Sequence, residues 1–155
     1  HWSLPFDTIL TARGSFAVVD SHGGDDNLPI FERQFLGGAR DLRGFQFRDI
    51  GPRDATGPNA TQEVLGGATS VFGSLEFTFP VIGQVRGAVF YDAGFVNSDS
   101  WDFNTGRLAS DVGIGVRLNL PGIGPLAVDF AVPVETPDDQ ADDGSQIQFY
   151  MDYQF

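Results

Sequence analysis

Alternation of apolar and polar residues constrains this chain more than any other feature of its sequence. The clearest run spans residues 108–120, where large apolar side chains fall at even positions and the odd positions hold Asp111, Gly113, Gly115, Arg117 and Asn119. Successive side chains of a β-strand point to opposite faces, so a period of two predicts a strand rather than a helix. The run is also long, since strands of soluble proteins usually have about five or six residues.

Five further segments alternate in the same way, at residues 7–19, 69–79, 85–96, 125–133 and 146–155. Charged residues in or at the ends of the six segments all fall on the polar phase of their own strand: Arg13, Glu76, Arg86, Asp92, Arg107, Asp111, Arg117, Asp129 and Asp152. One face of the predicted sheet is therefore free of charge. Both a lipid-facing surface and the buried face of a soluble β-sandwich have this property.

The connections between the predicted strands favour the membrane interpretation. A loop of over forty residues follows the first strand, and the later links alternate between short turns (80–84, 121–124) and longer loops (97–106, 134–145). Outer-membrane barrels have short turns at one end and long loops at the other, whereas Greek-key links of a sandwich need not alternate. The fold class predicted is all-β, an antiparallel up-and-down transmembrane β-barrel.

Composition excludes several classes of function. The formal net charge is -12 and all nine basic residues are Arg, which argues against nucleic-acid binding. There is no Cys, no run of about 18 apolar residues for a membrane helix, and no nucleophile elbow or dinucleotide-binding motif, so we expect no enzyme activity. His1 and His22 are too few for a zinc site. The acidic cluster at 138–143 matches no defined calcium loop, and a solvated loop is favoured.

Motifs in the long loop identify a family. The stretch 28–38, LPIFERQFLGG, is followed by Leu42, Arg43, Gly44 and Phe45. This order resembles the long extracellular loop of BamA-like outer-membrane β-barrel assembly factors, the BamA/TamA superfamily, which carries a (V/I/L)-R-G-(F/Y) motif there. Later motifs match the family in sequence order, namely Ile50-Gly51-Pro52, Gly66-Gly67, Leu75-Glu76-Phe77 with Pro80, Phe90-Tyr91-Asp92-Ala93-Gly94, and Gly124-Pro125-Leu126 with Pro133.

The last strand is similar to the family's C-terminal sorting signal. Gln148, Tyr153 and the terminal Phe155 match that signal, whereas Tyr150 stands where the family usually has Gly.

The resemblance implies that residues 1–155 are the C-terminal portion of a sixteen-stranded barrel. Its upstream strands and periplasmic repeat domains would be absent, and residues 20–65 would form an extracellular loop that folds into the lumen. Because six strands cannot close such a barrel, we expect an open, curved sheet whose edges are the strands at 7–19 and 146–155. Outward-facing side chains would be Leu10, Phe16, Val71, Phe77, Val89, Val116, Phe130, Met151 and Phe155, and inward-facing ones Arg13, Glu76, Asp92, Arg117, Asp129 and Asp152.

The function implied is insertion of β-barrel proteins into the bacterial outer membrane, by pairing of client strands at a lateral seam, without a cofactor or small-molecule substrate. The implied partners are outer-membrane lipid, unfolded β-barrel clients and assembly-complex lipoproteins. A TamA-like or two-partner-secretion barrel is the alternative within the superfamily. A passive porin-like channel and a soluble β-sandwich binding module are alternatives from other classes.

The residue singled out is Arg43. The resemblance implies that its loop enters the lumen, which Glu76 and Asp92 would face. We therefore expect the Arg43 guanidinium to lie within about 4 Å of one of these carboxylates. Gly44 would let the backbone turn tightly where a side chain would clash, and Phe45 would pack beside the arginine. Without the resemblance, a solvated arginine in a surface loop is the simpler interpretation.

Overall fold

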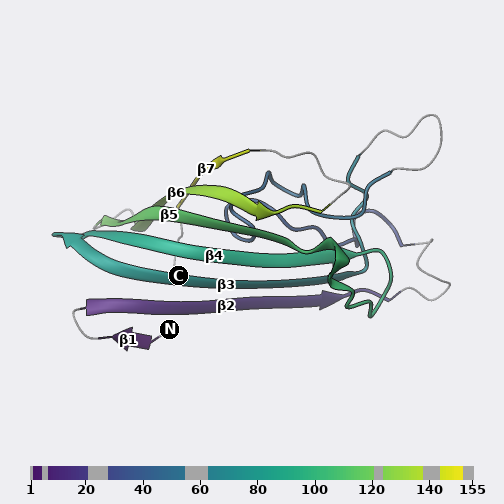
Figure 1. Cartoon of the computed structure of the whole chain (residues 1–155), viewed down its shortest axis with the longest axis horizontal. Coiled ribbons are helices and arrows are strands. Elements are labelled where there is room, and N and C mark those ends of the chain that lie inside the picture. Colours follow the sequence, from purple (N-terminus) through teal and green to yellow (C-terminus); the bar gives the residue numbers. More distant parts are fainter. Residues whose placement is uncertain are drawn as a thin grey trace.

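The computed structural model describes residues 2–4, 7–20, 28–54, 63–120, 124–137 and 144–151. Its strands are β1 (Trp2–Leu4), β2 (Thr8–Val18), β3 (Thr69–Ile82), β4 (Val85–Asn97), β5 (Ala109–Leu120), β6 (Gly124–Glu135) and β7 (Gln146–Met151), with a short 3-10 helix, η3 (Thr105–Arg107), before β5 (Figure 1). In this part of the chain, no helix has the length and apolar character needed to cross a membrane.

The strands form one antiparallel sheet in the order β1-β2-β3-β4-β5-β6-β7, so each strand pairs with its neighbours in sequence. The predicted all-β class and the six predicted strands are confirmed, and the first and last strands do not pair with each other. One expectation was wrong, because β1 pairs with residues 8–10 of β2 and is itself the first edge. Three residues are too few to show the alternation from which strands were predicted.

Strands β2 to β6 contain 11, 14, 13, 12 and 12 residues. A tilted strand needs about 9–11 residues to cross the hydrocarbon core of a membrane, so each is long enough. The long loops leave one end of the strands and the tight turns the other (Figure 1). Only Gly83 and Gln84 lie between β3 and β4, and Gly83 adopts a positive φ of 55° that suits glycine in a turn.

The two faces of the sheet have the predicted character. The register aligns an apolar row across the outer face, consisting of Leu10, Phe77, Val89, Ile114, Phe130 and Ile147. On the inner face it aligns Arg13, Ser74, Asp92 and Asp111. The face assignments are therefore confirmed for these strands, whereas Asp152 and Phe155, and the side chain of Met151, lie outside what the structure describes. Arg107, counted with the fifth strand, lies instead in η3.

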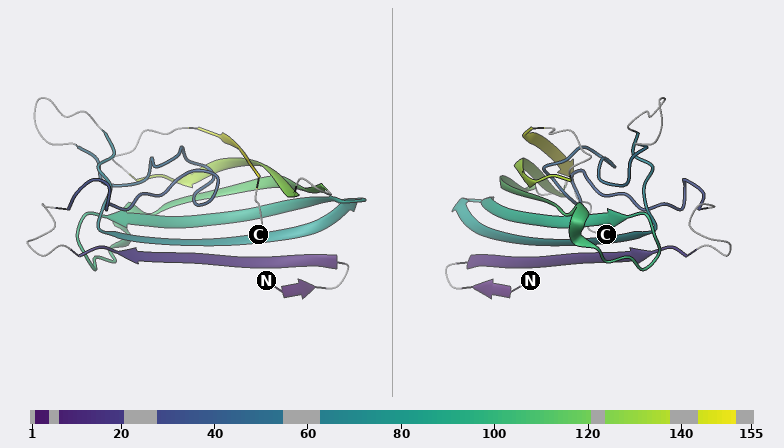
Figure 2. Two further views of the ribbon diagram at one scale, coloured as in Figure 1. Left: turned by 180° about the vertical axis from the view of Figure 1, so that it is seen from behind. Right: turned by 45° about the vertical axis from the view of Figure 1, so that its right-hand side comes forward.

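The segment 28–54 lies against the inner face, within the curl of the sheet (Figure 2). Three isolated bridges fix its course: Gln34 to Gly67, Leu36 to Ile50, and Arg53 to Val64. Its apolar side chains join the sheet in one buried cluster of Leu36, Leu42, Phe45, Ile50, Phe72, Val96 and Ala109. The inner face is therefore not uniformly polar, because the apolar Phe72 and Val96 share the charged phase and receive the loop.

Candidate functional site: a buried arginine network on the inner face

A compact turn carries Arg43 to the sheet. The backbone N–H of Phe45 donates to the Leu42 carbonyl at 3.2 Å, and the N–H of Gly38 donates to the same oxygen at 3.1 Å. Leu42, Arg43 and Phe45 are all 0% exposed. The two apolar side chains fix the turn in the loop–sheet cluster, and the arginine between them reaches the charged part of the inner face.

The guanidinium of Arg43 binds three carboxylates from three strands. Its Nε and Nη2 donate to the two oxygens of Asp92 on β4, at 2.7 and 2.9 Å. Its Nη1 donates to Glu76 on β3 at 2.6 Å and to Asp129 on β6 at 3.1 Å. The expected contact with Asp92 or Glu76 is thus confirmed for both, and Asp129 is a third partner.

Burial and charge act in opposite directions on Arg43. Burial by itself lowers the pKa of the guanidinium, but the hydrogen bonds and negative charges of Asp92 and Glu76 outweigh it, so the net shift of the pKa is upward. Arg43 is therefore a permanent cation. Because its Nη2 also donates to the Ser74 hydroxyl at 3.3 Å, each of its three nitrogens has a hydrogen-bond partner. A buried charge is tolerated only when its hydrogen-bonding groups have partners in this way.

An aromatic ring completes the surroundings of the guanidinium. The Arg43 Cζ lies 3.4 Å from the centroid of the Phe90 ring, a cation–π arrangement. The Phe90 ring in turn occupies space over Gly113 of β5, where any Cβ would collide with it. The sequence placed Gly113 on the polar phase of its strand and gave it no role in the site. The position of Gly113 on the charged phase, opposite a large aromatic residue, was the sequence signal that could have indicated this contact.

A second arginine lies in the same network. Arg117 on β5 donates to Glu76 from Nε at 3.2 Å and from Nη2 at 2.7 Å. It also pairs with Asp129, through Nη1 to Oδ1 and through Nη2 to Oδ2 at 3.1 Å. The sequence placed Arg117 on the inner face but did not assign it to the site.

The clash expected for a side chain at residue 44 is confirmed, although the backbone angles of the turn do not themselves require glycine. Gly44 is not among the residues with positive φ, so the turn does not require glycine for its backbone angles. A Cβ at this position would instead lie 2.5 Å from the Cβ of Asp111, which is 0% exposed. Glycine is needed because the loop backbone approaches β5 closely.

The remaining residues predicted for the site divide between two regions. Gln148 on β7 donates from Nε2 to the Phe45 carbonyl at 3.3 Å, so the last strand also contacts the arginine turn. Tyr153 and Phe155 lie outside the described residues, as does the acidic cluster at 138–143. In the described ranges there is no group of three or more His, Cys, Asp or Glu that could hold a metal ion.

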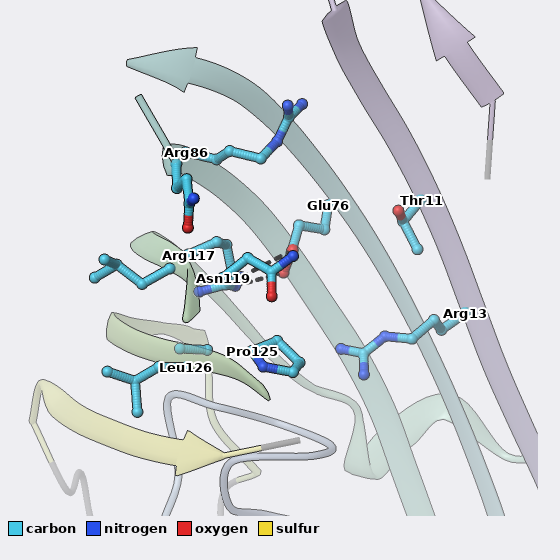
Figure 3. Close-up of a pocket in the computed structure, with 11 residues that line it drawn as sticks. Thr11, Arg13, Glu76, Arg86, Arg117, Asn119, Pro125 and Leu126 are labelled. Atoms are coloured by element: carbon cyan, nitrogen blue, oxygen red, sulfur yellow. Dashed lines mark hydrogen bonds and ion pairs between the residues drawn. The ribbon is translucent and has the colours of Figure 1, made fainter. Parts of the chain in front are cut away.

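A pocket of about 520 Å³ opens beside the network, toward the turn end of the sheet. Figure 3 shows Arg13, Arg86 and Arg117 around it, with Glu76 joined to Arg117. Arg86 pairs with Asp7 at 2.9 Å and does not share the carboxylates of Arg43. The network is therefore sealed by the loop on one side and accessible from the pocket on the other.

These features define a class of protein. A single curved antiparallel sheet has an apolar outer face and a charged inner face, and a long loop is anchored inside it by a buried arginine. This is a segment of transmembrane β-barrel wall with an inward-folded loop.

Comparison with known proteins identifies the family. The whole chain, residues 1–155, matches the model of the Omp85 superfamily domain, and the chain belongs to this superfamily of bacterial outer-membrane β-barrel proteins. It is 31% identical over 139 residues to an outer membrane protein assembly factor BamA from Nitratidesulfovibrio vulgaris, covering 87% of this chain and 17% of the relative. The crystal structure of BamA from Haemophilus ducreyi lacking POTRA domains 1–3 aligns with a TM-score of 0.73 and 28% identity, over 90% of this chain and 30% of that chain.

The chain thus spans less than a third of either protein. The predicted family resemblance and the outer-membrane location are confirmed. The alternative of a soluble β-sandwich is excluded, because the described strands form a single sheet and a sandwich consists of two. The family match agrees with this conclusion.

Proposed function

We propose that this chain forms the C-terminal wall of a larger barrel that inserts β-barrel proteins into the outer membrane. The observation that carries the proposal is that Arg43 anchors the loop to Glu76, Asp92 and Asp129. One guanidinium bound by three carboxylates is a specific structural feature and not an incidental surface contact. The similar BamA protein is named an outer membrane protein assembly factor, and this name supports a function in assembling outer-membrane proteins. Upstream strands and periplasmic domains complete the protein in this proposal.

The mechanism rests on the last strand. In the described part of the chain β7 pairs with β6 on one side only, so its other edge is available for a strand. Lipid cannot satisfy the N–H and C=O groups of a free edge, and a client strand that pairs there removes this cost. We propose that this edge belongs to a lateral seam where clients add strands. Because Gln148 of β7 binds Phe45, loop docking and edge position are mechanically linked.

The outer face of the sheet indicates which environment surrounds the proposed barrel. Exposed apolar side chains cover it, including Phe16, Ile114, Phe130 and Phe149 at 55, 62, 42 and 62% exposure. We propose that outer-membrane lipid covers this face, and that assembly-complex lipoproteins bind parts of the protein outside the membrane. The proposed role is conformational and non-enzymatic, because the charged groups of the site bind one another in a buried network.

A TamA-like or two-partner-secretion barrel is the second candidate. Membership of the Omp85 superfamily supports it equally, because these proteins share the barrel and differ mainly upstream. A passive channel is less well supported, because the loop fills the inside of the curl and is anchored by buried charges.

The decisive experiment compares two arginines of the same loop in the intact protein, reconstituted in lipid vesicles. Arg43→Ala leaves two buried carboxylates and one partly buried carboxylate without this partner. It should reduce insertion of an unfolded β-barrel client by about tenfold or more, given the usual strength of charged hydrogen bonds. Arg48→Ala is the matched control, since Arg48 lies over the Phe35 ring at 4.0 Å within the loop.

Equal insertion by wild type and Arg43→Ala would contradict the proposed role of the network. Failure of the wild-type protein to insert any barrel client, together with secretion of a passenger polypeptide, would favour the translocation alternative. An ion conductance that does not change when Arg43 is replaced would instead point to a channel.

A further inference from the structure

Arg43 and Arg117 share their carboxylate partners. Oε2 of Glu76 accepts from Arg43 at 2.6 Å and from Arg117 at 2.7 Å. Oδ2 of Asp129 accepts from both arginines at 3.1 Å. Two cations and two anions therefore alternate in a closed ring, and Asp92 extends it by binding Arg43 at two oxygens.

The two arginines differ in where they come from. Arg43 belongs to the loop, whereas Arg117 belongs to β5 and stays in the wall wherever the loop lies. Glu76 on β3 and Asp129 on β6 are separated by two strands, so their carboxylates must converge across the sheet to meet the same guanidinium. Two partly or fully buried carboxylates repel each other unless a cation lies between them.

We propose that Arg117 is a positioning residue that holds Glu76 and Asp129 in place for Arg43, so that the docking site for the loop persists when the loop is released. The loop then acts as a reversible latch on a preformed site. This inference rests on the proposed function and deepens it, because a preformed site would let a loop released during client insertion dock again without rebuilding its partners.

Local geometry supports the wall origin of this site. A Cβ at residue 115 would overlap Asp129 and lie 2.6 Å from Nη1 of Arg117. Gly115 therefore provides the space in which Arg117 and Asp129 pair, and this requirement does not involve the loop. Arg117 lines the pocket of about 520 Å³ drawn in Figure 3, and none of the residues that line this pocket belongs to the loop segment 28–54, so the pair is not enclosed by loop residues alone.

Docking of the loop can be measured separately from client insertion. Ala109 is 0% exposed and lies in the cluster beneath Leu42 and Phe45. This chain contains no Cys, so Ala109→Cys is a unique reporter within it, and its rate of reaction with a maleimide measures how often the loop lifts from the sheet. The experiment uses the intact protein in lipid vesicles, free of other cysteines, with heat-modifiable gel migration as the test of barrel folding.

Arg117→Met should raise the labelling rate about tenfold, the effect of losing hydrogen bonds between charged groups, while gel migration stays unchanged. Arg117→Lys keeps the charge but not the planar fork that spans two carboxylates, so it should restore only part of the protection. Arg86→Met is the matched control, because Arg86 borders the same pocket but pairs with Asp7. It should label at the wild-type rate.

Two results would overturn the proposal. If Arg117→Met is labelled at the wild-type rate or more slowly, the repulsion between the two guanidiniums outweighs the stabilisation that comes from the carboxylates they share. A wild-type rate for Arg117→Lys would mean that charge alone suffices. If Arg117→Met does not fold, Arg117→Gln replaces it, since its amide donates to one carboxylate. Because labelling needs no client, faster labelling with normal insertion would leave this inference standing while the proposed role of the network in insertion fails, and a wild-type protein that inserts no client would remove the proposed function without affecting the labelling result.

Discussion

The two faces of this sheet are built from the same strands, yet they obey different rules. Outward positions are large, apolar and exposed, as Val89, Ile114 and Phe130 show at 43, 62 and 42%. Inward positions combine charged residues with glycine and alanine, and Ala88, Ala127 and Ala131 are at most 5% exposed. If lipid covers the outer face, as proposed, that face needs only to be apolar, since lipid adapts to its shape. The inner face must fit a loop, so each inward position has a required size as well as a required polarity.

Two strand glycines offer the strongest way to test this contrast. Gly115 faces inward, and Gly115→Val would place its side chain in the space of the Arg117–Asp129 pair. Overpacking together with a broken buried ion pair should destabilise the protein by about 3–5 kcal/mol. Gly73 faces outward, and a Cβ there meets nothing within 4 Å. Gly73→Val should be neutral or slightly stabilising, by up to about 1 kcal/mol.

Denaturant unfolding of both variants in the same detergent or lipid measures the difference. Equal losses of stability would show that glycine in these strands serves backbone geometry on both faces, and the distinction between the faces would then fail.

A charge on the outer face should have the next largest effect. Ile114 lies in the middle row of the apolar face, between Val89 and Phe130. Ile114→Arg should destabilise the inserted protein by about 2–4 kcal/mol, the cost of Arg near the midplane of a bilayer. Val134, near the loop end of β6, is the control, where the same change should cost about 0–1 kcal/mol.

In vesicles, the free energy of unfolding should fall more for Ile114→Arg than for Val134→Arg. If the outer face met a polar environment instead of lipid, the two losses would be equal. Matching values for Ile114→Arg and Val134→Arg would count against lipid as the partner of this face.

Sequence alone predicted the outer face better than the inner one. Alternation identifies the exposed phase, because every outward residue needs the same property, and it therefore placed Leu10, Phe77 and Val89 correctly. It also placed Glu76, Asp92 and Arg117 inward. Contacts across strands that are not neighbours depend on the curvature of the sheet and on side-chain length, which alternation does not contain.

Arg43 could be paired with Glu76 and Asp92 only through the family motif. The sharing of Glu76 and Asp129 by Arg117 was missed, because no pattern along one strand reports a contact from β5 to β3. A clash at residue 44 was expected, but its partner Asp111 was not identified, since Asp111 lies far away in sequence. The short strand β1 was missed because three residues carry no period.

The smallest effect expected concerns the boundary of the apolar face. Phe16, Trp101 and Phe103 gather at the loop end of the sheet, with ring centroids 6.4 Å apart for Phe16–Trp101 and 5.8 Å for Phe16–Phe103. All three are more than half exposed, at 55, 62 and 52%. Aromatic side chains gather where a membrane barrel meets the lipid headgroups, because their rings suit a boundary that is apolar on one side and wet on the other.

Trp101→Ala should therefore destabilise the inserted protein by about 1 kcal/mol, the usual contribution of an aromatic pair beyond its buried area. The position of the ring can be checked by fluorescence in a variant whose other tryptophan, Trp2, is replaced by Phe, provided that Trp101 is the only tryptophan of the intact protein. Quenching groups attached near the lipid headgroups should quench Trp101 more strongly than groups at the ends of the acyl chains. Stronger quenching from the acyl-chain ends would place this cluster within the hydrocarbon core, and the apolar face would then extend further toward the long loops than the aromatic boundary implies.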